Sequence, residues 1–343
     1  MVVKGVLLPG NKQVVIADLP KPEAQAGEVL VRIKASAICR SDMSLYYGGD
    51  ATVGGDAAEG FITGHEPAGV VEAVGAGVHT FGPGDRVAVY LAIGCGVCES
   101  CRQGFFQLCP RWTCLGFTAN GGNAEYLVVP ERNLLAIPDE MSFVAAATST
   151  DAFGTLYSTA KKLAVSGSTT VGIWGLGPMG ASGILACRAR GARVIAVDPL
   201  EERRELALEL GADEALDPTP GDVVEQILAL THGRGVDAAI DCSGNGSAQN
   251  AALDATAPLG RVAFIGEAKE LSIRPSEQLI RKQLTVMGSW YFNISEWQEI
   301  ARVIVDQQIP LEKLVTHRFS LDDAATAFQM FDERKTEKAV FEI

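Results

Sequence analysis

Two short segments near the N-terminus carry side chains that metal ions bind. Cys39 offers a thiolate, His65 an imidazole and Glu66 a carboxylate. Zinc takes sulfur, nitrogen and oxygen ligands, and a catalytic zinc keeps one position open for water or substrate. Asp42 could orient the His65 ring as an acceptor, and Ser41 adds a hydroxyl within reach of whatever binds the metal. The set predicts a catalytic zinc site; the alternative is a buried free cysteine and an unrelated histidine.

Four further cysteines lie close together with the spacing C-x2-C-x2-C-x7-C: Cys95, Cys98, Cys101 and Cys109. Four thiolates at this spacing can close a tetrahedral zinc site with no open position, which makes the site structural. An iron–sulfur cluster is the alternative, because its sequences share Cys-x2-Cys-x2-Cys and a final Cys-Pro, present here at Cys109. Zinc is favoured because a second zinc site and a nucleotide-binding fold accompany it. In a reducing compartment, such a cluster indicates metal binding rather than disulfides.

A glycine-rich sequence in the second half of the chain has the features of a dinucleotide-binding turn. Gly175-Leu176-Gly177-Pro178-Met179-Gly180 follows a buried strand predicted at 169–174 and precedes a helix predicted at 181–190. Asp198 stands 23 positions after the first glycine, at the end of the next predicted strand. The glycines permit a tight turn and close approach of a pyrophosphate, the helix N-terminus attracts the phosphates, and the acidic residue accepts from the ribose hydroxyls.

The elements that must position these residues fall into two regions. Residues 1–35 alternate apolar and polar, and 68–91 hold short Val-rich segments, so the part with the metal residues is predicted to be mostly β. From 171 onward strands alternate with helices, which predicts a doubly wound parallel α/β sheet. The C-terminal part is predicted to form two helices and a final strand, at 290–307, 322–331 and 339–343.

Length and charge narrow the class of protein. The 343 residues are enough for two domains with hydrophobic cores. The 47% hydrophobic and 21% charged residues are typical of a globular enzyme. A net charge of −13 argues against nucleic acid as a partner, because no basic field is available for phosphates. We find no signal pattern and no apolar run long enough to span a bilayer, so we expect a cytoplasmic protein without a membrane partner.

Together these features resemble the zinc-dependent medium-chain dehydrogenase/reductase family, the alcohol dehydrogenase-like enzymes, over essentially the whole chain. The resemblance rests on the segments around Cys39 and His65, the four-cysteine lobe, the glycine-rich turn and Asp198. It implies a GroES-like, mostly β catalytic domain at 1–152 and 290–343, with a Rossmann NAD-binding domain at 153–289. It also implies two zinc ions per subunit, NAD as cofactor and an active site between the domains.

The resemblance assigns roles around the catalytic zinc. Asp151 stands where relatives carry a third ligand, usually cysteine; its alternative role is a helix N-cap. Glu66 is then an intermittent fourth ligand when no substrate is bound. Ser41 resembles the hydroxyl relay for the alcohol proton, although Ser44 replaces the histidine that often continues it. Arg40 matches a position that often contacts the cofactor phosphates, or it is a solvated surface arginine.

The implied reaction is hydride transfer between an alcohol and the nicotinamide, with zinc as the Lewis acid. Asp198 predicts NAD rather than NADP, because its carboxylate would repel the 2′-phosphate. Alignment places the Phe117 ring over the zinc and Leu91 on another wall of the pocket. The stretch around Trp290 lacks the arginine with which sorbitol dehydrogenases hold substrate hydroxyls. We therefore expect a small to medium, secondary alcohol with a ketone product.

Other substrates, and one non-enzymatic role, fit the same residues. Polyol and amino-alcohol (threonine-like) dehydrogenases are the alternatives among enzymes, and a non-catalytic nucleotide-binding scaffold is the alternative outside them. A Gly-rich stretch at 46–60 either covers something or is a variable surface loop. The short path from Cys109 to Glu125 resembles tetrameric relatives, so a homotetramer is expected, with a dimer as the alternative.

Overall fold

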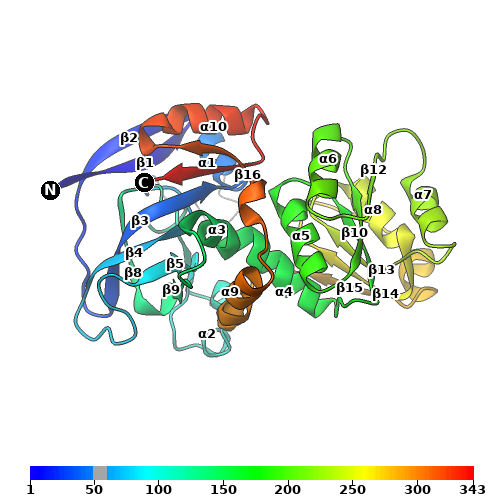
Figure 1. Ribbon diagram of the computed structural model, residues 1–343, viewed down its shortest axis with the longest axis horizontal. Helices are drawn as coiled ribbons and strands as arrows, with labels where there is room; N and C mark the ends of the chain where they lie inside the picture. Colours follow the sequence, from blue (N-terminus) through cyan, green and yellow to red (C-terminus); the bar gives the residue numbers. More distant parts are fainter. Residues whose placement is uncertain (49–59) are drawn as a thin grey trace. The chain divides into compact units, whose positions relative to one another are not determined.

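The computed structural model describes residues 1–48 and 60–343. The chain forms two compact units (Figure 1): unit 1 comprises Met1–Asp151 and Asn293–Ile343, and unit 2 comprises Ala152–Phe292. Most of the predicted Gly-rich loop at 46–60 lies outside the described residues. Within those residues, no helix combines the length and apolar character that crossing a bilayer requires.

Unit 1 is built mainly from β-strands. Its main sheet contains β3 (Glu28–Ile38), β4 (Glu66–Val74), β5 (Arg86–Val89), β8 (Tyr126–Pro130), β9 (Leu134–Ala136), β16 (Val315–Phe319) and β17 (Lys338–Glu342). In the described residues their order is β16-β17-β3-β4-β5-β9, and β8 also pairs with β3. Only β16 and β17 run parallel among these pairs. Two smaller ladders join β1 (Val2–Gly10) to β2 (Gln13–Pro20) and β6 (Ala92–Ile93) to β7 (Thr113–Cys114).

The strand pattern explains the core of this sheet. Val29, Val31 and Ile33 recur at every second position of β3 and are fully buried. They pack with Val71 of β4 and Val87 of β5 in one hydrophobic cluster. Because alternate residues of a strand share a face, this one face of β3 fixes the register of its neighbours.

Five short helices accompany the strands of unit 1 in its described part: α1 (Asp42–Tyr47), α2 (Glu99–Arg102), α3 (Phe143–Thr148), α9 (Trp297–Asp306) and α10 (Ala324–Asp332). Figure 1 shows α1 and α10 beside β1 and β2. The Tyr46 ring of α1 stacks on Phe328 of α10, with centroids 5.9 Å apart. Phe328 also contacts Phe341 of β17, at 6.2 Å. These contacts anchor the segment that follows β3.

Unit 2 confirms the doubly wound sheet. Its strands are β10 (Thr170–Trp174), β11 (Arg193–Val197), β12 (Glu214–Leu216), β13 (Val236–Asp241), β14 (Thr256–Phe264) and β15 (Thr285–Gly288). All pairs are parallel, in the order β12-β11-β10-β13-β14-β15. Helix α4 (Gly154–Lys162) precedes β10, and the α-helices between the strands are α5 (Pro178–Ala189), α6 (Glu201–Glu209), α7 (Val223–Leu230) and α8 (Gly246–Ala255).

Adjacent residues of β10 show that helices cover both faces of this sheet. Trp174 packs with Ile227 of α7 and Leu253 of α8. A Cβ placed on Gly183 of α5 would lie only 3.4 Å from Ile173. Because neighbouring residues of a strand point to opposite faces, α5 covers one face and α7 and α8 cover the other.

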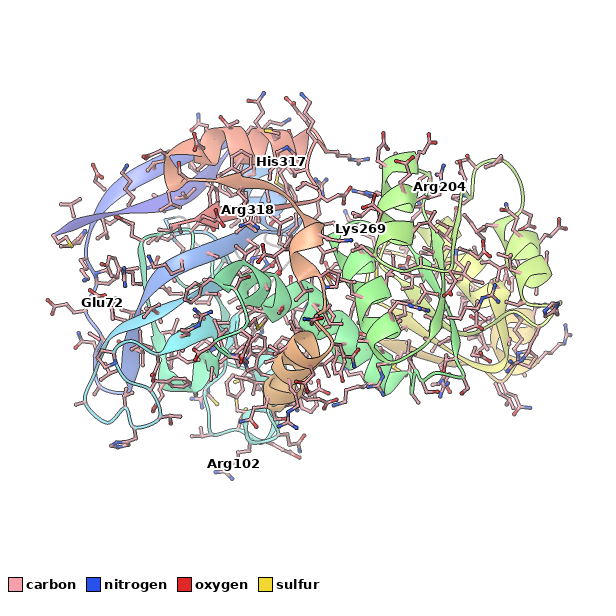
Figure 2. All side chains as sticks on the ribbon, in the orientation of Figure 1. Glu72, Arg102, Arg204, Lys269, His317 and Arg318 are labelled. Carbon is pink, nitrogen blue, oxygen red and sulfur yellow. The ribbon has the colours of Figure 1, made fainter. Side chains whose placement is uncertain are left out.

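Three parts of the fold differ from the prediction. Neither β15 nor β16 was expected, because both are short and partly exposed, and apolar and polar residues do not alternate in their sequences. On β16, Arg318 (Figure 2) forms ion pairs with Glu312 and Glu342 at the surface. The helix predicted at 290–307 begins only at Trp297, because Asn293 caps a preceding 3₁₀ turn in a capping box.

Candidate active site and metal centres

Strand pairing in unit 1 brings the first two predicted metal-binding segments together. Cys39 directly follows β3, and Glu66 is the first residue of β4. Ala37 of β3 lies opposite Glu66 in the register of the two strands. The chain therefore places Cys39 beside His65 and Glu66 although more than twenty residues separate them.

Asp151 reaches the same place from a different element. It lies inside a π-helical turn, Ser149–Phe153, that continues α3. The N-cap of α3 is Ser142, whose hydroxyl accepts from the backbone of Ala145. The alternative role of Asp151 as a helix N-cap is therefore wrong. π-helical turns occur frequently at functional sites, because the extra residue re-aims the side chains of the turn.

Four side chains form a compact group of potential metal ligands: Cys39, His65, Glu66 and Asp151, with one ligand atom from each within 4.8 Å of all the others. Cys39 Sγ lies 3.5 Å from Asp151 Oδ2, and His65 Nε2 lies 3.6 Å from the same oxygen. A tetrahedral zinc with bonds of about 2.0–2.3 Å would hold such atoms roughly 3.4–3.6 Å apart. Atom types and spacing therefore fit one zinc ion.

Asp42 fixes the orientation of the His65 ring, as predicted. Asp42 Oδ1 lies 3.1 Å from His65 Nδ1, and its other oxygen accepts from the Cys39 backbone N–H at 2.9 Å. With the proton on Nδ1, the Nε2 lone pair is available to a metal. Burial acts to lower the pKa of His65, but Asp42 and Asp151 raise it well above its usual range. The carboxylates thus favour a cation at this ring, whether a proton or a metal ion.

Glu66 is fully buried and its two carboxylate oxygens differ. Oε1 lies 3.9 Å from His65 Nε2 and also pairs with the ammonium of Lys338 on β17. Oε2 is buried and has no hydrogen-bond partner among residues 1–48 and 60–343, which is costly unless a ligand satisfies it. Burial raises the pKa of Glu66 to about 7, and Lys338 opposes this rise. The Glu66 carboxylate therefore keeps one oxygen available to a cation.

The four-cysteine lobe also forms one compact group, of Cys95, Cys98, Cys101 and Cys109. Cys95 Sγ and Cys101 Sγ are 4.0 Å apart, and all four sulfurs lie within 4.8 Å of one another. Zn–S bonds of about 2.3 Å place tetrahedral sulfurs roughly 3.8 Å apart. In an iron–sulfur cluster the sulfurs bind different irons and lie farther apart. The spacing therefore favours a single ion.

Backbone amides donate hydrogen bonds to two of these sulfurs. The N–H groups of Cys95 and Arg111 donate to Cys109 Sγ, and that of Cys98 donates to Cys95 Sγ, each at 3.4 Å. Backbone hydrogen bonds lower the pKa of Cys95 to about 5, whereas burial raises the pKa of Cys101 to about 12. Thiolates are the metal-binding form, so Cys95 is ready to bind a cation, whereas Cys101 would have to lose its proton when a metal binds.

In unit 2 the glycine-rich turn joins β10 to α5. Gly175 has a positive φ of 81°, which favours glycine. A Cβ on Gly180 would lie 1.9 Å from the carbonyl oxygen of Gly175. The helix can therefore lie this close to the turn only if residue 180 is a glycine. A Cβ on Gly177 would meet nothing nearer than the Arg203 guanidinium, at 3.7 Å. The space beside Gly177, at the start of α5, is therefore available to a phosphate.

Asp198 is fixed at the end of β11 next to this turn. Its Oδ2 accepts from the Leu176 backbone N–H at 2.8 Å, and its Oδ1 accepts from Leu200 at 2.9 Å. Arg203 Nη1 lies 3.7 Å from Oδ2, and Arg204 (Figure 2) donates to the Asp198 carbonyl. Sequence reasoning missed Arg203, whose only signal was the charged first turn of α6. Asp198 is thus held rigidly where ribose hydroxyls are expected.

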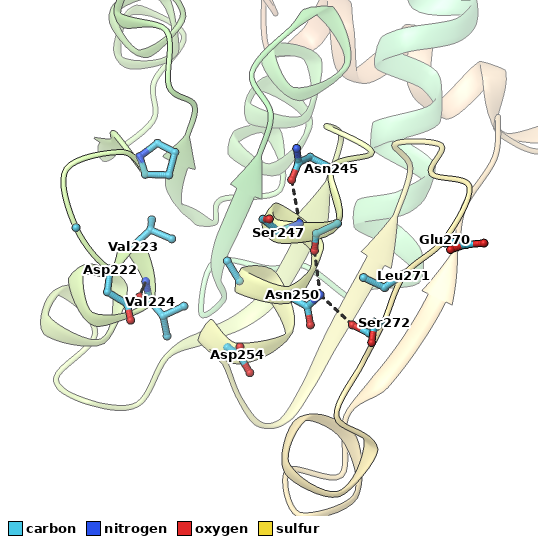
Figure 3. Close-up of a pocket in the computed structure, with 14 residues that line it drawn as sticks. Asp222, Val223, Val224, Asn245, Ser247, Asn250, Asp254, Glu270, Leu271 and Ser272 are labelled. Atoms are coloured by element: carbon cyan, nitrogen blue, oxygen red, sulfur yellow. Dashed lines mark hydrogen bonds between the residues drawn. The ribbon is translucent and has the colours of Figure 1, made fainter.

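An open hollow of about 1000 Å³ lies between the start of α7, the helix α8 and residues 270–272 (Figure 3). Figure 3 shows Asn245 accepting from the Ser247 backbone at the start of α8, and Asn250 donating to the Ser272 carbonyl. The charged residues that line it are all acidic: Asp222, Asp254 and Glu270. This charge disfavours phosphate, which leaves the glycine-rich turn as the better place for a pyrophosphate.

The predicted pocket residues lie in different units. In unit 1, the Phe117 ring is 5.3 Å from the His65 ring, so it borders the metal group. Leu91 is fully buried in the same unit. In unit 2, Trp290 is 39% exposed and stacks on Tyr291 with centroids 4.9 Å apart. The structure of unit 1 alone therefore supplies an apolar neighbour for the metal group.

The residues around the start of α1 differ in their burial and in their contacts. Ser41 is half-buried immediately before the helix. Ser44 Oγ donates to the Ser41 carbonyl at 2.8 Å, so this hydroxyl is used within the helix. Arg40 is exposed and interacts electrostatically with Tyr47 and Asp332. Its role toward cofactor phosphates stays a prediction.

Comparison with known proteins identifies the family. Residues 178–306 match the zinc-binding dehydrogenase family, and residues 25–139 match the alcohol dehydrogenase GroES-like domain. The zinc-type alcohol dehydrogenase-like protein YphC of Escherichia coli K12 is 37% identical, covering 97% of this chain and 96% of that protein. The chain is a zinc-dependent medium-chain dehydrogenase/reductase.

Further relatives agree with this membership. The L-threonine 3-dehydrogenase of Pyrococcus abyssi is 35% identical to this medium-chain dehydrogenase, over 96% of the chain and 94% of that enzyme. An alcohol dehydrogenase of Escherichia coli CFT073, solved with NADH, has a TM-score of 0.91 and 28% identity, covering 100% and 99% of the two chains. The GroES-like and Rossmann fold class is thereby confirmed, and the protein is a zinc-type alcohol dehydrogenase-like oxidoreductase.

Proposed function

We propose that this medium-chain dehydrogenase oxidises small to medium secondary alcohols to ketones with zinc and NAD. The observation that carries the proposal is the group of Cys39, His65 and Asp151, with the partly unsatisfied Glu66 beside it. When bound there, zinc supplies the Lewis acidity that favours loss of the hydroxyl proton. Three permanent ligands leave one position for a substrate hydroxyl. The four-cysteine lobe is proposed to hold a second, structural zinc.

The chain's own residues would orient the reactants and move the proton. Asp42 holds the His65 ring, and Phe117 lies against that ring and offers apolar surface. Ser41 is proposed to carry the proton away from the alcohol. Because the Ser44 hydroxyl donates to a backbone carbonyl, water rather than Ser44 is proposed to complete the relay. The turn at Gly175–Gly180 would hold the cofactor pyrophosphate, and Arg40 is proposed to contact it.

The substrate preference follows from the apolar surroundings. Phe117 and Leu91 are almost completely buried and offer no hydrogen bond from their side chains. A polyol would bury several hydroxyls against such a wall, and each one left without a partner costs about 1–3 kcal/mol. A methylene buried there contributes roughly 0.8 kcal/mol instead. Trp290 is proposed to belong to the same pocket.

This proposal predicts a trend among substrates. Along 2-propanol, 2-butanol and 2-pentanol, kcat/KM with NAD should rise by up to roughly fourfold per added methylene. Sorbitol and xylitol should be poor substrates. Initial rates of NADH formation, before and after removal of zinc by a chelator, measure the trend. A polyol that exceeds every simple alcohol tenfold would contradict the pocket assignment, and NAD binding without turnover of any alcohol would favour a scaffold role.

An amino alcohol is the second candidate. The L-threonine 3-dehydrogenase of P. abyssi is 35% identical to this chain over nearly the full length of both. The hydroxyl at position 3 of threonine is itself secondary, so the same chemistry would serve both substrates. L-Threonine therefore belongs in the same screen. It becomes the better assignment if its kcat/KM exceeds that of the best simple alcohol.

Asp198 is proposed to set the preference for NAD over NADP. Its carboxylate would repel a 2′-phosphate in a partly desolvated site. Asp198→Asn retains an oxygen for the Leu176 N–H but removes the charge, so the NAD/NADP ratio of kcat/KM should fall about tenfold or more. Asp213→Asn removes a charge that pairs with Arg188 and should leave the ratio unchanged. A wild-type enzyme that prefers NADP would overturn the assignment.

We also propose a cytoplasmic homotetramer. All eight cysteines are free in the structure, and a reducing compartment would keep the two metal-binding groups in the thiol form. The short path from Cys109 to Glu125 is the feature that favours the tetramer over the dimer. Light scattering coupled to size-exclusion chromatography measures this directly, and a dimer mass would contradict it.

A further inference from the structure

A buried lysine faces the catalytic metal group from a strand distant in sequence. Lys338 begins β17, is 2% exposed, and pairs through Nζ with Oε1 of the fully buried Glu66. Val340 of β17 lies opposite Ala37 of β3, which lies opposite Glu66 of β4. Residues two apart on a strand share a face, so Lys338 and Glu66 point to the same side of the sheet. The register of β17, β3 and β4 therefore brings Lys338 and Glu66 together.

The lysine balances the charge of the metal group. Cys39 as a thiolate, together with Asp151 and Glu66, carries three negative charges, whereas a zinc ion carries two positive ones. Lys338 supplies a third positive charge, which balances the charges of these three ligands; the buried Asp42 carboxylate behind His65 adds one further negative charge. An uncompensated buried charge is strongly destabilising, so a lysine is tolerated at this position only because a carboxylate matches its charge.

The geometry places the ammonium in competition with a metal ion for one atom. Glu66 Oε1 is the carboxylate oxygen that lies 3.9 Å from His65 Nε2, and it is also the oxygen that Lys338 binds. Oε2 of the same carboxylate has no hydrogen-bond partner in the described part of the chain. An oxygen that is already held by an ammonium gives less of its charge to a zinc ion.

We propose that Lys338 is a positioning residue that holds Glu66 by Oε1 and so keeps it a weak, displaceable ligand of the catalytic zinc. The inference rests on the proposed function, because it requires zinc at the group of Cys39, His65 and Asp151. A substrate hydroxyl then replaces Glu66 at little cost, since the carboxylate keeps its partner when it leaves. Without Lys338, the displaced Glu66 would be a buried charge with no partner.

The test is the substitution Lys338→Met in the zinc-loaded enzyme. Methionine is apolar and of similar length, so Glu66 should turn to the zinc. Release of the catalytic zinc to a chromophoric chelator should slow about tenfold, and KM for 2-butanol should rise about tenfold, the range usual for residues in contact. KM for NAD should not change. The catalytic phase of release is identified as the one that Asp151→Ala lacks.

A double variant separates positioning from support of the fold. In Lys338→Met/Glu66→Gln no carboxylate remains to hold the zinc, so the slow release should disappear. If Lys338 only supported the fold, Lys338→Met would release zinc faster, and Glu66→Gln would not reverse the change. If methionine prevents folding, Lys338→Gln removes the charge but still donates to Glu66, so it should show the same changes to a smaller degree.

The outcomes also separate this inference from the proposed function. If the wild-type enzyme binds only the zinc of the four-cysteine lobe, the proposed function itself fails. If it binds two zinc ions and Lys338→Met leaves both the release rate and KM unchanged, only the role of Lys338 is overturned.

Discussion

Replacing Asp151 with alanine is expected to abolish alcohol oxidation while the protein still binds NAD. The substitution removes the oxygen that lies 3.5 Å from Cys39 Sγ and 3.6 Å from His65 Nε2, so only two permanent ligands remain. Loss of a group that merely orients a ligand costs 10–100-fold, and loss of a ligand should cost more than about 100-fold. The glycine-rich turn belongs to unit 2, so the NAD site keeps its own residues.

Zinc content and NADH binding are the measurements for this variant. The zinc content measured by elemental analysis should fall from two ions per chain to one. The affinity for NADH, measured by fluorescence titration, should stay unchanged. Thr150→Ala is the matched control, because Thr150 lies in the same π-helical turn and its hydroxyl donates to the Ala147 carbonyl. If Asp151→Ala retains full zinc and activity, Asp151 has only a local structural role.

Cys98→Ser is expected to cause the largest loss of stability. Serine is a poor zinc ligand, and a structural zinc contributes about 10–16 kcal/mol to the folding of small zinc domains. Even a fraction of this free energy is large beside the roughly 5–15 kcal/mol that stabilises a typical domain. The four-cysteine lobe should open, and the melting temperature of the protein should fall together with one zinc ion per chain.

Cys114→Ala provides the comparison for that variant. Cys114 is a fully buried cysteine of β7 in the same unit, outside both metal groups. The Cys114→Ala substitution should lower the melting temperature modestly, because it leaves a small cavity. The zinc content should stay at two ions per chain. Calorimetry measures the melting temperature, and elemental analysis measures the zinc content, of the same samples. An unchanged zinc content in Cys98→Ser rules out the structural zinc.

Local spacing in the sequence is what made most of the site predictable. The four cysteines lie within one short loop, so their mutual distances are set by few residues. The turn from Gly175 to Gly180 is likewise local, and its context between a strand and a helix was readable from hydrophobicity. The alternation of strands and helices after it predicted the doubly wound sheet. The family resemblance then added Asp151, which no spacing argument could have supplied.

Long-range pairing is what the sequence did not reveal. Lys338 begins a short strand whose next three residues are apolar and buried, but a lysine at the start of a strand is ordinarily exposed. Its partner Glu66 lies 272 residues away. The π-helical turn that contains Asp151 was also invisible, because the same residues suit a helix N-cap. Edge strands such as β15 escaped because their side chains are half exposed and follow no pattern.

The discontinuity of unit 1 has a consequence for the order of events during synthesis. The last residues of β3, which lead into Cys39, pair on one side with β17, and β17 follows the whole of unit 2 in the chain. Unit 2 is continuous and can fold while translation proceeds. Until β17 arrives, this part of β3 is an open strand edge, which invites pairing with other chains. Nascent unit 1 should therefore need protection by chaperones until residues 338–342 have emerged from the ribosome.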